Sequence, residues 1–66
     1  MKVKHPEVSV QLSGGSGNAF MIIGRVMQAM KRAGLPKEEI DAFRKEAESG
    51  DYDNVLQTCM RWVDVS

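Results

Sequence analysis

The sequence predicts a mostly helical α+β fold in which a short N-terminal strand is followed by three helices. Two patterns predict it. Apolar and polar residues alternate near the N-terminus, as in a half-buried strand, and three later segments repeat apolar residues every three or four positions, as amphipathic helices do. Glycine, proline and serine separate these segments, as expected of turns.

The strand is expected at residues 7–13. Its apolar residues alternate with polar ones at Val8, Val10 and Leu12. Pro6 suits the start of a strand because it has no N–H to donate. The glycine-rich segment 13–17 that follows is expected to form a turn or loop.

The clearest helix is expected at residues 18–33. Asn18, or Ser16, suits its N-cap, where a side-chain oxygen accepts from the first N–H groups. Gly34 suits its end because glycine tolerates the left-handed conformation. The apolar stripe is centred on Phe20, Ile23, Met27 and Met30 and is broadened by Ala19, Ile22, Val26, Ala29 and Ala33.

Two shorter helices are expected next. The second begins at Pro36, which suits the first helical position, and continues to about residue 48. Asp51 is expected to cap the third. Residues 62–65 alternate, so the chain either finishes this helix or leaves it as a short strand. The two apolar stripes consist of Leu35, Ile40, Phe43 and Ala47, and of Tyr52, Val55, Leu56, Cys59 and Val63.

A chain of 66 residues is expected to form one small domain, residues 1–66. Such a domain buries only about 60% of the surface that its unfolded chain exposes. The single strand also needs a partner for its backbone groups. Three partners are open: a hairpin with residues 1–4, the C-terminal residues 63–65, or the same strand of a second copy in a homodimer.

Composition excludes several classes of protein. The longest apolar run, Ala19 to Ile23, has five residues, whereas a membrane helix needs about 20, and no signal peptide is visible. The single cysteine, Cys59, forms no internal disulfide, which favours a reducing, cytoplasmic setting. We therefore expect no membrane association.

Two segments have a superficial likeness to ligand sites. The glycine-rich segment 14–17 lies between strand and helix, as phosphate loops do, but it lacks the lysine and the third glycine that those motifs need. Residues 51–54 begin like a calcium loop, but Leu56 and Trp62 occupy the positions that need glycine and glutamate. We expect no metal and no cofactor.

No catalytic group of residues is evident. Cys59 lies on an apolar stripe, where a buried, inert thiol is usual. His5 lies in an N-terminal segment that is expected to fray. A nucleophile needs a base within hydrogen-bonding distance and a group that orients the base, so we do not expect an enzyme.

The helix at residues 18–33 is apolar around much of its circumference, and the rest of a chain this small does not cover all of it. An uncovered apolar face with basic residues beside it is typical of an interaction surface. The candidate interaction surface consists of Phe20, Met21, Arg25, Gln28, Lys31, Arg32 and Trp62.

The net charge is zero, but the two halves differ. Residues 1–34 have five basic residues and one acid, for a net charge of +4, whereas residues 35–66 have four basic residues and eight acids, for −4. The basic half leaves nucleic-acid binding as an alternative. A helix–turn–helix would place the second helix in the major groove, but Glu38 and Glu39 at its start would be repelled by phosphate.

Three stretches, residues 17–26, 50–53 and 60–65, resemble a group of very small uncharacterised proteins of bacteriophages and of bacterial genomes that carry prophages. The resemblance extends over nearly the whole chain from Val8 onward. It implies a bacterial or phage cytoplasmic setting. The group has no assigned activity, so the resemblance implies no catalytic or binding residue.

These observations together predict a non-enzymatic interaction protein of phage or prophage type. It would bind a protein partner through the helix at residues 18–33, the strand edge, or both. The alternative is a nucleic-acid-associated module that uses the basic N-terminal half.

Overall fold

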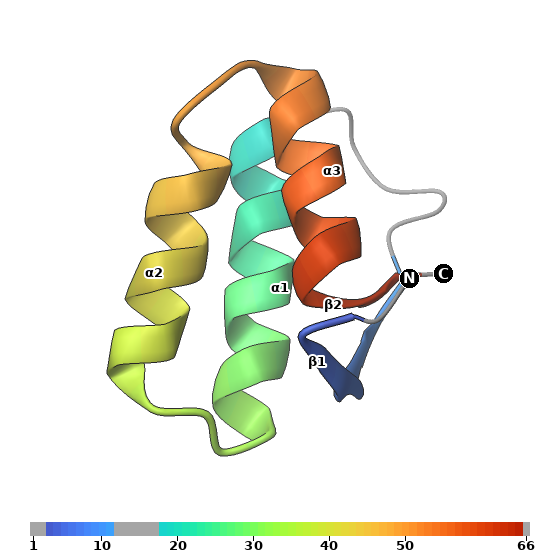
Figure 1. Cartoon of the computed structure of the whole chain (residues 1–66), viewed down its shortest axis with the longest axis vertical. Helices are drawn as coiled ribbons and strands as arrows, with labels where there is room; N and C mark the ends of the chain where they lie inside the picture. The colour runs from blue at the N-terminus through green and yellow to red at the C-terminus, as the bar shows by residue number, and fades with distance from the viewer. Residues whose placement is uncertain (1–2, 12–17, 66) are drawn as a thin grey trace.

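The computed structural model describes residues 3–11 and 18–65 and has the expected α+β architecture (Figure 1). Three helices pack against one another, each in contact with the other two, and a small sheet packs at one end of α1 and α3. The elements are β1 (His5–Val10), α1 (Ala19–Arg32), α2 (Lys37–Ala47), α3 (Tyr52–Trp62) and β2 (Val63–Val65).

The two strands come from opposite ends of the chain and pair in parallel. Parallel strands require a long connection, and here it contains all three helices. Of the three partners considered for the N-terminal strand, the structure selects the C-terminal residues. The register pairs His5 with Val63, Ser9 with Asp64 and Val10 with Val65.

The observed strand begins and ends earlier than residues 7–13. The pairing is irregular between His5 and Ser9, and this irregularity accommodates Pro6, which has no N–H for a ladder. β2 has only three residues, and its last pair is Val10 with Val65. Residues 12–17, including the glycine-rich segment and the alternative cap Ser16, lie outside the described residues.

The helix caps follow the sequence closely. The Asn18 side chain accepts from the Phe20 N–H at 2.9 Å, and the Asp51 side chain accepts from the Asn54 N–H at 3.0 Å. α2 begins at Lys37, with Pro36 in an extended conformation just before it. Pro36 therefore precedes the helix rather than occupying its first position.

The core lies where the inner faces of the helices meet the sheet. Phe43 and Trp62 meet edge to face, with their ring centroids 5.8 Å apart. Phe20 does not belong to this core, because it is 76% exposed. The buried stripe of α1 is therefore not centred on Phe20, as the sequence predicted, but consists of Ile22, Ile23, Val26 and Met30. The buried apolar residues are Val8, Val10, Ile22, Ile23, Val26, Met30, Phe43, Ala47, Val55, Cys59, Trp62 and Val63.

Two glycines of α1 and its end differ in backbone conformation, and of the two only Gly34 has a positive φ. Gly34 has φ +86°, and the Leu35 N–H donates to the Met30 carbonyl across it, which is the glycine-dependent helix end of the Schellman type. We expect Gly34→Ala to lower the free energy of unfolding by about 1 kcal/mol, because the added Cβ disfavours this conformation.

Gly24 is the matched control for this substitution. It lies inside α1 with nothing within 4 Å of an added Cβ, so Gly24→Ala should raise the free energy of unfolding by about 0.5–1 kcal/mol. Urea unfolding followed by Trp62 fluorescence measures both. Equal effects of the same sign would contradict this account of the helix end.

Candidate functional site

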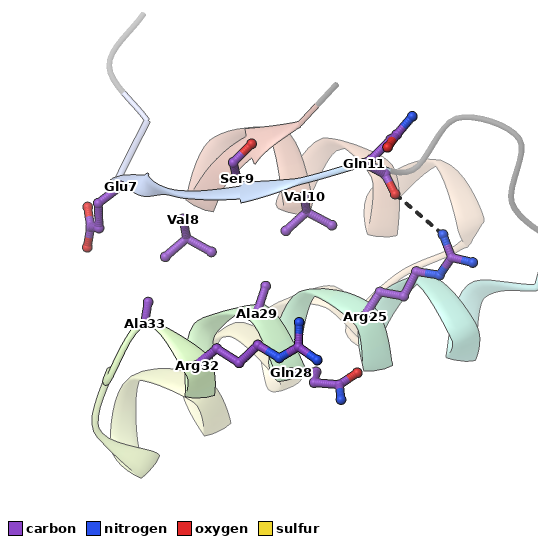
Figure 2. A pocket seen from close by; sticks show the side chains of 10 residues that line it. All are labelled: Glu7, Val8, Ser9, Val10, Gln11, Arg25, Gln28, Ala29, Arg32 and Ala33. Atoms are coloured by element: carbon purple, nitrogen blue, oxygen red, sulfur yellow. Dashed lines mark hydrogen bonds between the residues drawn. The ribbon is translucent and has the colours of Figure 1, made fainter.

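A groove runs along β1 and the second half of α1 (Figure 2). It has a volume of about 560 Å³. In the part of the chain that the structure describes, β1 has a neighbouring strand, β2, on one side only. The other edge of β1 borders the groove, which is lined by Glu7, Val8, Ser9, Val10, Gln11, Arg25, Gln28, Ala29, Arg32 and Ala33.

The floor of the groove is apolar and shallow. Val8 and Val10 point from β1 toward α1 and are buried against it (Figure 2). Opposite them lie Ala29 of α1 and Ala33, which caps the end of that helix. Because an alanine side chain is a single methyl group, these positions leave the hollow beside the strand open.

The wall on the α1 side is basic. Arg25, Gln28 and Arg32 are separated by three and four residues, so they share one helix face. The Arg25 Nη1 donates to the backbone carbonyl of Gln11 at 3.4 Å, which ties α1 to the end of the strand. Residues 19–32 contain no acid, so this face of the helix is not neutralised from within α1.

The structure divides the predicted surface into separate places. Three of its residues, Arg25, Gln28 and Arg32, come together in the groove. Met21 precedes Arg25 by one turn and is 51% exposed, so it extends the same face. Lys31 is exposed, but it lies about 100° around the helix from Arg32. It neighbours Gln28 on the side away from the two arginines and does not line the groove.

Phe20 borders a second hollow, of about 520 Å³, where the start of α1 meets the α2–α3 connection. Tyr52, which is 42% exposed, lines the same hollow. Phe20 is thus exposed, as an interaction residue would be, but it does not share the groove.

Trp62 was wrongly assigned to the surface, because only 4% of it is exposed. The last turn of α3 directs its ring inward, and the residues just before and within β1 cover it. The Lys4 Nζ lies 4.0 Å from the ring centroid, and the His5 ring centroid lies 5.8 Å from that of Trp62. The sequence could not show this cover, because it comes from the opposite end of the chain.

The segment around His5 is held in place, contrary to the expectation that it frays. His5 Nε2 lies 3.2 Å from a Glu39 carboxylate oxygen, and Nδ1 lies 3.4 Å from Glu7. The Lys4 N–H donates to the Arg61 carbonyl at 2.9 Å. These contacts fix the start of β1 against α2 and α3.

Glu46 joins α2 to the covered tryptophan. Its Oε2 accepts from Arg61 Nη2 at 3.0 Å and from Trp62 Nε1 at 3.1 Å. These hydrogen bonds, from Arg61 first and then Trp62, hold the pKa of the Glu46 carboxyl below its ordinary value of 4.5. The ionised carboxylate therefore supports the position of Trp62.

The strand edge was predicted as a possible binding surface, but none of its residues was named among the candidate surface residues. Glu7, Ser9 and Gln11 line the groove, although their polar side chains in an alternating pattern suggested only a solvated strand face. The signal that indicated the strand edge was the unpaired strand itself, whose backbone groups need a partner.

Cys59 and His5 do not form a nucleophile–base pair. Cys59 is fully buried, and burial raises the pKa of its thiol to about 11. His5 is directed at the carboxylates of Glu39 and Glu7. No group of three or more histidine, cysteine, aspartate or glutamate side chains among residues 3–11 and 18–65 is arranged to hold a metal ion.

Comparison with protein-family models, curated proteins and solved structures gives no significant match. The resemblance to small phage proteins therefore stays a prediction. None of the helices that the structure describes has the length and apolar character needed to span a bilayer.

The lowered pKa of Glu46 predicts an acid-dependent contribution to stability. A carboxyl whose pKa is lower in the folded state stabilises the fold above its ordinary pKa, and this contribution is lost as the pH falls. Glu46→Gln should lower the free energy of unfolding by less than about 1 kcal/mol at neutral pH. The difference from the parent protein should vanish as the pH falls below 4.5.

Glu48→Gln is the matched control, since Glu48 accepts from Arg44 on the surface and has no contact with tryptophan. Urea unfolding across this pH range measures both variants. A Glu46→Gln difference that persists unchanged at low pH would contradict the role given to the carboxylate.

Burial of Cys59 predicts a thiol that is unreactive in the folded protein. At about pH 8 a thiol with a pKa near 11 is almost wholly protonated, and the core also shields it from solvent. Ellman's reagent should react with it only after unfolding. Full labelling within the dead time under native conditions would contradict this placement.

Proposed function

We propose that this protein is a non-catalytic interaction module whose groove holds an extended segment of a partner protein. The observation that carries the proposal is the edge of β1, which has no neighbouring strand among the described residues and borders a groove with a basic wall. The segment would add to β1 as a third strand.

Strand addition suits what the edge offers. An unpaired edge presents a row of N–H and C=O groups that another extended chain can pair with. Two-stranded sheets are marginal, and a third strand increases their stability. The groove, of about 560 Å³, runs along the edge at which such a strand would add, and Arg25, Gln28 and Arg32 of α1 form one wall of it.

A second copy of this chain is a less suitable occupant of the groove. If two copies paired through their β1 edges, each would bring its own α1 beside the other. The faces with Arg25 and Arg32 would then lie near each other, and like charges across an interface oppose association. We therefore do not propose the homodimer that the sequence left open, and the experiments below would detect it.

Nucleic-acid binding is also less well supported. Lys31 lies about 100° around α1 from Arg32 and does not line the groove that Arg25 and Arg32 share, so the three cations point over a wide arc. The α1–α2 connection leads directly to Glu38 and Glu39 in the first turn of α2, where acids would meet phosphate in a helix–turn–helix complex.

The setting that we propose for this function is the cytoplasm of a bacterium, with a phage or prophage origin. The resemblance of residues 17–26, 50–53 and 60–65 supports the origin. The lone, buried Cys59 supports a reducing compartment.

The test begins with a displayed library of random eight-residue peptides selected on the immobilised protein. Recovered peptides should shift the amide resonances of β1 and of the Arg25–Arg32 face. Peptides N-methylated at alternate residues should divide into two sets, of which only one binds, because a strand in a ladder directs alternate amides toward its neighbour.

Two protein variants test the position. Gln28→Trp fills the groove and should weaken peptide binding at least about tenfold, because the indole occupies the space of the added strand. Gln57→Trp is the matched control, since Gln57 is exposed on α3 and outside the groove. Light scattering shows whether the unliganded protein is a monomer of 7.3 kDa.

Three outcomes would overturn the proposal. The first is peptides that perturb the Phe20–Tyr52 hollow instead of β1. The second is a dimer that the Gln28→Trp substitution dissociates, which would show that a second copy occupies the groove. The third is a single-stranded oligonucleotide that binds the Arg25–Arg32 face when no peptide does.

A further inference from the structure

We infer that the segment held by this groove is acidic and presents carboxylates at alternate positions to Arg25 and Arg32. The inference rests on the proposed function, because it specifies the side chains of the strand that would add to β1. It is carried by the pairing state of the arginines, by their spacing along α1 and by the direction of the β1 side chains.

The four arginines of the sequence differ in whether an acidic side chain pairs with them. Arg44 pairs with Glu48 at 3.3 Å and Arg61 pairs with Glu46 at 3.0 Å. In contrast, neither arginine of the groove forms an ion pair within residues 3–11 and 18–65. The one acid that lines the groove is Glu7, at the far end of the strand, and it lies 3.4 Å from His5.

An arginine guanidinium matches a carboxylate better than it matches any other side chain, because its fork of N–H groups can donate two parallel hydrogen bonds. Arg25 is held near the strand end by its bond to the Gln11 carbonyl, at 3.4 Å a long one that leaves other donors of the guanidinium available. Gln28 lies between the two arginines on the same wall and can donate or accept.

The spacing of the arginines selects the pattern of the ligand. Arg25 and Arg32 are seven residues apart, which is about 10.5 Å along a helix axis. Side chains on one face of a strand recur at about 6.7 Å and 13.4 Å, for residues two and four apart. Arginine side chains are long enough to make up the difference between about 10.5 Å along the helix and either about 6.7 Å or about 13.4 Å along the strand. Carboxylates an odd number of residues apart would instead lie on opposite faces of the strand.

The face that the carboxylates occupy follows from β1 itself. Val8 and Val10 point toward α1 (Figure 2), and a strand added beside β1 continues the same sheet. Every second side chain of that strand therefore points toward α1, where the wall with Arg25 and Arg32 stands. The intervening side chains point away from α1 to the opposite face of the sheet.

Three acetylated, amidated eight-residue peptides test the inference. Each alternates threonine with a second residue, which is glutamate, glutamine or lysine. Titration followed by amide resonances, at about 50 mM salt, should give the tightest binding for the glutamate peptide and the weakest for the lysine peptide. A fourth peptide, with four glutamates followed by four threonines, has the same composition without the alternation and should bind at least about threefold more weakly.

Protein variants assign the effect to the two arginines. Arg25→Gln combined with Arg32→Gln should weaken the glutamate peptide at least about fivefold, as expected for two exposed ion pairs, and should affect the glutamine peptide much less. Arg44→Gln is the matched control on α2. Arg25→Glu combined with Arg32→Glu should reverse the preference in favour of the lysine peptide.

The outcomes separate the inference from the proposed function. If the glutamine peptide binds as tightly as the glutamate peptide and shifts β1 resonances, the acidic ligand is wrong and strand addition stands. If the block peptide binds as tightly as the alternating one, the alternate placement of carboxylates is wrong. If none of the four peptides binds and the random library yields no β1 ligand, strand addition itself fails.

Discussion

The fold depends on how the two ends of the chain are joined over Trp62. β2 begins directly after this residue, so the last turn of α3 places both the indole ring and the paired strand. Lys4 and His5 cover the ring, and Glu46 accepts its N–H. A strand of three residues has few ladder bonds to offer, so the side-chain contacts around the tryptophan must help to hold β1 in place.

The groove is a consequence of that attachment. With β1 paired to β2 on one side, its inward valines rest on α1 and its other edge lies beside Arg25, Gln28 and Arg32 (Figure 2). Small residues at positions 29 and 33 keep the space open. The basic face of α1 needs no strand to form, but it becomes one wall of a site only because β1 runs along it.

Local chemistry made much of the fold predictable. The caps at Asn18 and Asp51 and the left-handed Gly34 each depend on residues within a few positions, so the sequence pattern identified them. The exposed Phe20 and the buried Trp62 were assigned less well. Phe20 was expected at the centre of its apolar stripe and Trp62 beside its own. The side of a helix that becomes buried depends on which other element packs there, and periodicity does not contain that information.

The sequence alone determined the class of fold, the number and order of its helices and the basic character of one face of α1, because these depend on short-range spacing, capping and charge. Only the tertiary structure decided that the first strand pairs in parallel with the last three strand-forming residues, 63–65, and that His5 is held by Glu39. It also decided that three of the predicted surface residues meet an open strand edge. His5 and Glu39 are more than thirty residues apart in the sequence, and so are the paired residues of β1 and β2. No local pattern encodes which distant residues come into contact.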